Sequence, residues 1–369
     1  MNKRIFIVAF FAFLFLAGSV YAAIGITELR TEQLKNPLGI DVRQPRLGWR
    51  IESDEQNVMQ TAYHILVASS ADLLAQGKGD IWDSGKIESD ASQWIAYQGK
   101  PLKRNARYYW KVKVYTNRGE ADWSAPAFWS MGLLNEADWQ GQWIGLDRAA
   151  SGDSETQWSR LAARYLRKEF ALSKEVKRAT VHIAGMGLYE LFINGQRIGD
   201  QVLAPAPTDY RKTILYNTYD VTPQLRKENA IGVTLGNGRF YTMRQNYKPY
   251  KIPTFGYPKL RLNLIVEYMD GSKETIATNT SWKLTTEGAI RSNNEYDGEE
   301  YDARKELGNW TQSGYDDKSW IAAQRVSIPS GTLRAQIMPG MKVMDTLKPV
   351  SIQKLGDKYI LDFGQNMAG

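Results

Sequence analysis

The stretch from Ala179 to Asn237 constrains the fold of this chain more than any other segment. Tyr189, Leu191 and Ile193 alternate with Glu190 and Phe192, which is the period of a β-strand and puts the first three on one face. Asn194-Gly195 follows at once. This pair is the strongest short hairpin signal, because a type I′ turn needs positive φ at both of its central residues. The stretch therefore predicts antiparallel strands joined by a tight turn.

The same alternation recurs along the chain, and no long amphipathic helical pattern accompanies it. The strand-like runs are AYHILVA near residue 65, YYWKVKVYT near 112, AIGVTLG near 233 and LRLNLIVEY near 264. Asp270-Gly271 marks a second hairpin. Short alternating strands separated by turns predict an all-β chain with a β-sandwich over 24–133 and an antiparallel jelly-roll sandwich over 138–335. The strand YILDF near 360 predicts the first strands of a further β domain over 336–369, unless this tail packs on the jelly roll.

The N-terminus has the pattern of a secretory signal peptide. MNKRIFIVAFFAFLFLAGSVYA combines a basic start, an apolar run, and small residues at Val20 and Ala22, ahead of the expected cleavage site. We expect residues 1–22 to be removed and the protein to be exported, either to the periplasm or outside the cell. The apolar run is short for a spanning helix of about 20 residues, although an uncleaved anchor is the alternative. We expect no membrane span after cleavage.

Composition excludes several classes of chemistry. The chain has no cysteine, so disulfides, thiolate metal sites and a cysteine nucleophile are ruled out. Its two histidines, His64 and His182, both lie in strand-like runs, where they are interpreted as residues on a strand face. The net charge of +7 is dispersed without a basic run, so we expect no nucleic-acid partner.

Polar and aromatic side chains of the kinds that contact sugars gather at the hairpin turn and in two loops, TDYR and LGNGRFY. Ordinary loop packing is the alternative reading of the same residues. The candidate carbohydrate-binding residues are Asn194, Asp209, Tyr210, Asn237, Arg239 and Tyr241.

An acidic cluster lies in NNEYDGEEYDAR, and its carboxylates admit three roles. They could form structural ion pairs with Arg291 and Arg304, or bind calcium or sugar hydroxyls. A third role is catalysis, but paired catalytic carboxylates normally face each other from separate elements, whereas these crowd one segment. We expect no cofactor to be required and leave a metal ligand unassigned. The residues concerned are Asp297, Glu299, Glu300 and Asp302.

Several of these motifs occur together, and in the same order, in a known family. YELFINGQRIGDQVLAPAPTDYRKTILYNTYDVT, AIGVTLGNGRFY, NNEYDGEEYDAR and YILDFGQNMAG resemble the N-terminal part of a bacterial multidomain α-L-rhamnosidase of the inverting kind. The resemblance covers essentially the whole mature chain. It implies a fibronectin type III-like (immunoglobulin-like) domain, a galactose-binding-like jelly roll, and the opening of a concanavalin-like β domain. The chain departs from the family at Ala206-Pro207, where relatives often have Gly-Trp.

The resemblance also implies a function. The family hydrolyses terminal α-L-rhamnose from glycans or glycosides, and its general acid and base lie on an (α/α)6 barrel downstream of the β domains. No catalytic residue has a matching position here, so we expect accessory β modules of a secreted α-L-rhamnosidase that are inactive alone. A free-standing carbohydrate-binding protein is the alternative hypothesis. The chain ends inside DFGQNMAG rather than after a completed sheet, which favours truncation before the catalytic domain.

Overall fold

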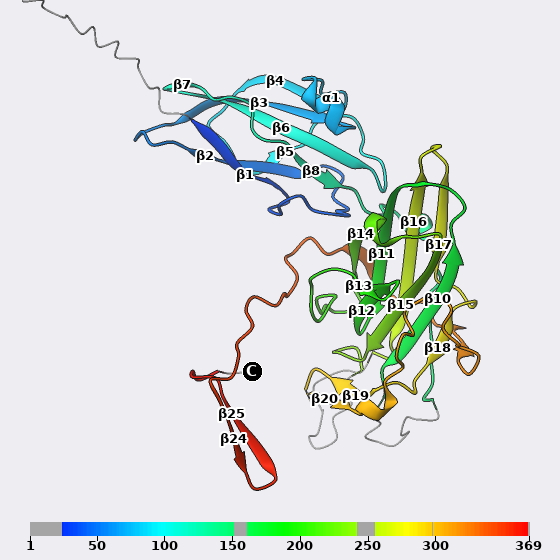
Figure 1. Ribbon diagram of the computed structural model, residues 1–369. Helices are drawn as coiled ribbons and strands as arrows, with labels where there is room; N and C mark the ends of the chain where they lie inside the picture. The colour runs from blue at the N-terminus through cyan, green and yellow to red at the C-terminus, as the bar shows by residue number, and fades with distance from the viewer. Residues whose placement is uncertain (1–23, 151–160, 242–254, 297, 368–369) are drawn as a thin grey trace, which may run out of the picture.

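The computed structural model describes residues 24–150, 161–241, 255–296 and 298–367 (Figure 1). Within these ranges the longest helix is α1 (Ala71–Ala75), and β-strands form the rest of the regular structure apart from three single turns of 3₁₀ helix. The all-β prediction is therefore confirmed. None of the helices in the described ranges has the length and apolarity to cross a bilayer. The predicted leader, residues 1–22, lies outside the described residues.

The first unit packs two sheets around a core of buried aromatic residues. The three-stranded sheet has the order β1 (Gly25–Thr31), β2 (Arg46–Glu52), β5 (Ile95–Ala96). The other sheet has the order β4 (Trp82–Glu88), β3 (Gln60–Ala68), β6 (Arg107–Thr116), β7 (Gly119–Glu120), and β8 (Ala127–Ser130) pairs with β6. Trp49, Trp110 and Trp129 are fully buried between the sheets. Their apolar area supplies much of the burial that a chain without disulfides needs.

The second unit is a larger sandwich of two sheets. One sheet runs β13 (Gln196–Arg197), β12 (Leu188–Ile193), β15 (Glu228–Gly236), β10 (Arg164–Ala171), β18 (Lys283–Thr285), β21 (Ile321–Ala322). The facing sheet runs β22 (Gln324–Arg325), β9 (Ile144–Gly145), β16 (Lys259–Tyr268), β11 (Val176–Met186), β14 (Thr213–Asp220), β23 (Thr332–Ala335), with β17 (Lys273–Ala277) also on β16. Only β14 and β23 among these pairs are parallel in the described residues. The antiparallel pairing explains the clear alternation seen in the sequence.

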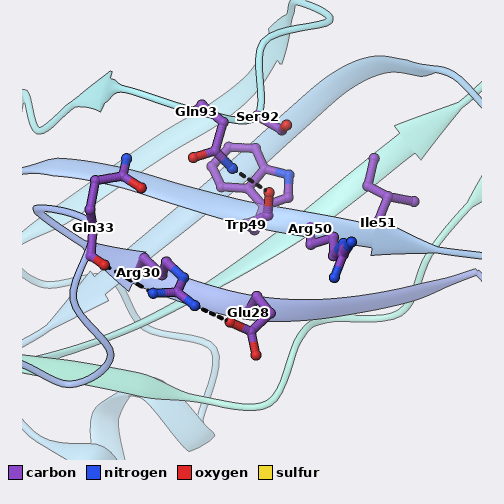
Figure 2. Close-up of a pocket in the computed structure, with 8 residues that line it drawn as sticks. All are labelled: Glu28, Arg30, Gln33, Trp49, Arg50, Ile51, Ser92 and Gln93. Carbon is purple, nitrogen blue, oxygen red and sulfur yellow. Dashed lines mark hydrogen bonds and ion pairs between the residues drawn. The ribbon is translucent and has the colours of Figure 1, made fainter. Parts of the chain in front are cut away.

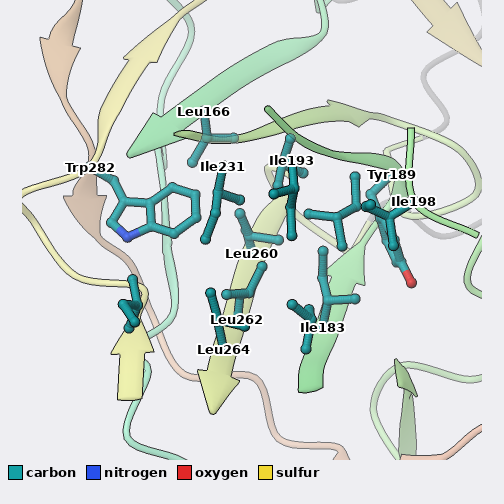
Figure 3. Close-up of a cluster of buried hydrophobic side chains, with 14 of the residues drawn as sticks. Leu166, Ile183, Tyr189, Ile193, Ile198, Ile231, Leu260, Leu262, Leu264 and Trp282 are labelled. Atoms are coloured by element: carbon teal, nitrogen blue, oxygen red, sulfur yellow. The ribbon is translucent and has the colours of Figure 1, made fainter. Parts of the chain in front are cut away.

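The core of this second sandwich lies between the inner faces of its sheets (Figure 3). Leu191 and Ile193 of β12 share one buried cluster with Leu262 and Leu264 of β16, and all four side chains are at most 1% exposed. Trp282 closes one end of the same cluster (Figure 3). The alternation predicted from the sequence therefore matches the buried face.

Both predicted hairpins are confirmed. At Asn194 φ is 50° and at Gly195 it is 83°, so both turn residues lie in the left-handed region that a type I′ turn requires. The turn connects β12 to the short strand β13 in register, with Ile193 opposite Gln196. In the second hairpin Gly271 has φ 84°, and its N–H donates to the Tyr268 carbonyl across a short loop between β16 and β17.

The two sandwiches contact each other through polar side chains of β11 and β14. His182 is completely buried there, with Nδ1 2.9 Å from Thr218 Oγ1 and Nε2 3.1 Å from Asn105 Oδ1 of the first unit. Arg107 of the first unit pairs with Asp220 at 2.7 Å. Burial, followed by the nearby Arg178 charge, lowers the pKa of His182 to about 3, so the imidazole is neutral and bonded at both nitrogens.

The C-terminal segment leaves the second sandwich before it forms its own hairpin. The Val202 N–H donates to the Met341 carbonyl at 2.9 Å, and Lys342 pairs with Asp200 at 2.5 Å. Beyond this point β24 (Ser351–Leu355) and β25 (Lys358–Asp362) pair only with each other (Figure 1). This tail is thus a separate hairpin and does not add strands to the jelly roll.

Candidate functional site

One rim of the jelly roll gathers most of the residues expected to contact sugar. The loop after β15 begins at Asn237 and lies against the hairpin formed by β19 (Ile290–Asn294) and β20 (Gly298–Tyr301). Asn237 is 2% exposed, and its Nδ2 donates to the carbonyls of Leu161 and Asn293, both at 2.8 Å. Its own N–H donates to Asn293 Oδ1 at 2.6 Å. Asn237 therefore ties the loop, the β19–β20 hairpin and the segment before β10 together.

Arg239 continues the loop and points to the acidic hairpin. Its Nε donates to Glu295 Oε2 at 2.7 Å and its Nη2 to Glu295 Oε1 at 3.1 Å, which is a two-point ion pair. A third contact joins Nη2 to the Tyr296 hydroxyl at 3.3 Å. The guanidinium and the first carboxylate of the acidic motif therefore neutralise each other at the rim.

Aromatic side chains pack beneath this polar layer. Tyr210 is 3% exposed and meets Phe240 and Phe255 edge-on, each with ring centroids 5.2 Å apart. Burial is the main reason that the pKa of Tyr210 is raised to about 12, so its hydroxyl stays protonated. Tyr241 is 7% exposed and stacks on Tyr257 at 5.8 Å. Both tyrosines present little ring surface for a sugar to stack upon.

Two other candidates play local roles. Asp209 binds Arg211 through Nε at 2.9 Å and Nη2 at 3.1 Å, and this pair lowers the pKa of Asp209. Asn194 lies at the opposite end of β12 from the rim, because Ile193 pairs with Ile231 while Leu188 pairs with Gly236. The structure thus brings Tyr210, Asn237, Arg239 and Tyr241 to one rim and leaves Asn194 at the far end of the sandwich.

The acidic motif divides into separate contacts. Asp302 accepts from the Arg304 backbone N–H at 3.1 Å and pairs with the Arg304 guanidinium at 2.8 Å, which lowers the pKa of Asp302 to about 2. It begins the 3₁₀ turn Ala303–Lys305. Glu299 and Glu300 lie exposed on β20, and Asp297 is outside the described residues. Arg291 donates to the backbone carbonyls of Thr286 and Gly288.

The polar side chains at this rim are engaged in hydrogen bonds and ion pairs that hold the loop in place. Across the described residues, no three His, Asp or Glu side chains converge in a way that would hold a metal ion. Among the described residues of the motif, Glu295 and Asp302 pair with arginines, and Glu299 and Glu300 lie on the exposed strand β20. Calcium and sugar binding at this cluster stay predictions.

The sequence analysis missed residues outside the TDYR and LGNGRFY loops that contact these loops and hold them in place at the rim. Asn293 accepts two hydrogen bonds from Asn237, one through its side-chain oxygen and one through its carbonyl. Phe255 and Tyr257 supply the rings on which Tyr210 and Tyr241 pack. Asn293 opens the acidic motif in the sequence, so its position next to that motif was the one available signal. Nothing local links residues 255–257 to residue 210, because their contact depends on the folding of the two sheets.

Fold and rim together define a chain of two successive β-sandwiches, an immunoglobulin-like unit and a jelly roll. Family models agree with this division: residues 26–135 match the Rha78A-like N-terminal immunoglobulin domain, and residues 174–345 match the α-L-rhamnosidase N-terminal domain. By sequence and by fold, the chain matches the N-terminal β domains of α-L-rhamnosidases.

Individual relatives support this assignment. An α-L-rhamnosidase of Formosa agariphila is 40% identical over 355 residues, which cover 90% of this chain and 37% of the relative. The solved α-L-rhamnosidase of Dictyoglumus thermophilum is 39% identical with a TM-score of 0.83, covering 93% of this chain and 38% of that one. An α-L-rhamnosidase of Streptomyces avermitilis, solved in complex with L-rhamnose, is 25% identical with a TM-score of 0.83. The match covers 94% of this chain and 49% of that one. The chain thus spans less than half the length of each of these proteins.

Proposed function

We propose that this chain supplies the accessory β modules of an exported α-L-rhamnosidase that releases terminal α-L-rhamnose from glycans or glycosides. The relatives carry that activity in their names and match this chain across both sandwiches. Their remaining length is where we expect the helical catalytic barrel with its general acid and base. The modules described here hold polar groups in internal ion pairs, which suits a scaffold better than a hydrolytic centre.

The C-terminal hairpin is the observation that carries this proposal. Ile352, Tyr359 and Leu361 are 61%, 63% and 49% exposed, although they belong to paired strands. An isolated two-stranded hairpin is at best marginally stable in water, so such side chains require a further layer. The modules are therefore expected to continue into another β domain, which leads to the catalytic part.

Hydrolysis of an aryl α-L-rhamnoside tests the proposal directly. The purified chain should give a flat progress curve, while a protein extended through the downstream helical region should release rhamnose. Activity of the chain alone would place the catalytic carboxylates within it and overturn the proposal. DNA that continues past codon 369 into helical repeats would support it, whereas a stop followed by a separate promoter would favour a free-standing carbohydrate-binding protein.

Export and ligand binding need their own measurements. N-terminal sequencing of protein recovered from the periplasm or medium should begin at Ala23, and a cell-bound product retaining Met1 would contradict export. L-rhamnose titrated by calorimetry, with and without calcium, tests the rim. We expect no heat at millimolar sugar, because the rim side chains are already paired internally. A calcium-dependent signal would instead assign the acidic cluster a ligand.

A further inference from the structure

The outer face of the three-stranded sheet in the first unit carries a depression of about 380 Å³ (Figure 2). The residues that line this depression belong to the first unit alone, so it is separate from the jelly-roll rim. Leu47 and Trp49 of β2 point into the core. Because side chains alternate along a strand, Gly48 and Arg50 lie on the outer face of the sheet. Because Gly48 has no side chain, the Gln93 carboxamide lies directly over the sheet at that point, with its Oε1 2.8 Å from the position that a Cβ of residue 48 would take.

Unusual backbone conformations shape the edge of this depression. A β-bulge between Thr27 and Arg30 places Glu28 at φ 49°, and Gln33 follows at φ 64°. Trp94, beside the depression, has φ 61°. Such conformations cost of order 1 kcal/mol or more for residues other than glycine, so the remaining structure must hold each of them in place. Glu28 and Gln33 line the depression itself, and Trp94 directly follows the lining residue Gln93.

Trp94 does not line the depression but stands beside it on the same outer face, since its ring contacts Arg46, which alternates with Gly48 and Arg50 along β2. It directly follows Gln93, and 54% of its area is exposed. The Arg46 guanidinium lies 4.5 Å from the ring centroid on one side, and Glu32 fixes Arg46 through a 2.5 Å ion pair. An indole that is both exposed and held in one orientation is the arrangement that stacks against the apolar face of a sugar ring.

Charge at the depression is positive. Arg30 pairs with Glu28 at 2.5 Å and donates to the Gln33 carbonyl at 3.0 Å, so its charge is compensated. Arg50 lies exposed on the same face, and no hydrogen bond or ion pair engages its guanidinium among the residues described. A guanidinium with five free donors is suited to bind a carboxylate or a sulfate.

We propose that this depression and the adjacent Trp94 together bind an acidic oligosaccharide, with Trp94 stacking on one sugar ring and Arg50 pairing with a carboxylate or sulfate farther along the same oligosaccharide. Gln93 offers a side-chain carbonyl above Gly48, since its Nε2 donates to the Trp49 carbonyl at 2.9 Å. Gln33 extends its amide from the opposite edge (Figure 2). The immunoglobulin-like unit would then hold the enzyme on a charged glycan, a role beyond the hydrolysis proposed above.

Calorimetry on the whole mature chain at low ionic strength tests this site with three probes of matched length. They are oligogalacturonate for the carboxylate, a sulfated dextran oligosaccharide for the sulfate, and neutral dextran. We expect one acidic probe to bind and neutral dextran to bind at least tenfold more weakly. Arg50→Gln should weaken acidic binding about tenfold, the loss of one charged hydrogen-bonded contact. Trp94→Ala should weaken it similarly, and Trp94→Tyr should restore part of it.

Arg118→Gln is the matched control, since Arg118 is an exposed arginine on the turn between β6 and β7 with a loose 3.9 Å pair to Glu55. It removes the same charge from the same unit and should leave binding unchanged. Equal losses in Arg50→Gln and Arg118→Gln would mean diffuse charge attraction and overturn the site. So would neutral dextran binding as tightly as the acidic probes, or no binding of either acidic probe at millimolar concentration. Which acidic probe binds identifies carboxylate or sulfate as the recognised group.

Discussion

Two Asn-Gly pairs lie at opposite ends of the same strand pair, β12 and β15, and they are used in different ways. At Asn194-Gly195 both residues have positive φ, and the pair turns one strand directly into the next. At Asn237-Gly238 only the glycine has positive φ, at 50°, and the chain continues into a longer loop. Both asparagine side chains are buried, at 9% and 2% exposed, and both bond to backbone groups distant in sequence.

The difference shows that a dipeptide does not define a turn by itself. Strand β13 returns beside β12 immediately after Asn194, so the type I′ turn matches the twist of the paired strands. In the described part of the chain after Asn237 no strand returns beside β15, which β12 and β10 already pair on its two sides. Asn237 instead fastens the β19–β20 hairpin through Asn293. Asn194 therefore stabilises the fold through its left-handed backbone conformation and its side-chain amide, whereas Asn237 does so through its side-chain amide alone.

The largest effect is expected at Asn194. Asn194→Ala removes donors to the Gln224 carbonyl and Asn229, and leaves the buried Ala230 N–H without its acceptor. Together with the strain of alanine at φ 50° this should lower the free energy of unfolding by about 3 kcal/mol. Asn194→Gly loses the same bonds without the strain, so urea denaturation should find it about 1 kcal/mol more stable than Asn194→Ala.

Asn237 should give the reverse order. Asn237→Ala leaves the buried Leu161 and Asn293 carbonyls without a donor and should cost about 2 kcal/mol. Asn237→Gly should cost more than Asn237→Ala, because φ is already negative there and glycine adds only chain entropy. The same denaturation series measures both sites. The proposed distinction would be contradicted if the alanine variant lost more free energy of unfolding than the glycine variant at both positions, or at neither.

A buried polar residue that can ionise should behave unlike either asparagine. The pKa of His182 is about 3 in the folded protein, below the unfolded value of 6.5, so between these values the unfolded chain binds more protons. Its contribution to stability is present above pH 6.5 and is lost as the pH falls toward 3. Wild type and Asn194→Gly should each lose about 2 kcal/mol between pH 7 and 5 from this residue.

Denaturation of His182→Gln over the same pH range isolates that contribution, since the loss between pH 7 and 5 should shrink by about 2 kcal/mol. An NMR titration offers a second readout that does not depend on the variant folding well. In it the His182 imidazole should remain neutral at pH 5. Protonation of His182 near pH 6.5 in the folded protein would show that the interface between the sandwiches opens to water.

The smallest effect is expected at the rim surface. Arg239→Gln removes the ion pair with Glu295, in which both side chains are about 40% exposed. Exposed pairs contribute little because water screens them, so the cost should be below about 1 kcal/mol and should shrink in high salt. A cost equal to that of Asn237→Ala would mean that charge, rather than the buried amide, holds the hairpin on the loop.

Much of the fold could be predicted because each strand of an antiparallel sheet alternates buried and exposed residues, and this alternation is visible in the sequence. Tyr189, Leu191 and Ile193 were expected on one face of a strand, and they are buried together. The candidate site was predicted less well. Arg239 and Glu295 are 56 residues apart and meet only because β15 and the β19–β20 hairpin end at one rim. Phe255 and Tyr257 carry no local sign of packing on Tyr210 and Tyr241.

The sequence by itself determined the all-β class, the two hairpin turns and the resemblance to α-L-rhamnosidases, since these depend on periodicity, on turn chemistry and on motif order. Only the tertiary structure decided which polar residues face a ligand and which face the protein. Asn194, Asn237 and Tyr210 look like sugar-binding residues in the sequence, yet they are buried in the sandwich. Trp94 and Arg50 attract no attention there and lie exposed on one face of a sheet. Burial depends on contacts between distant strands, which the local sequence does not contain.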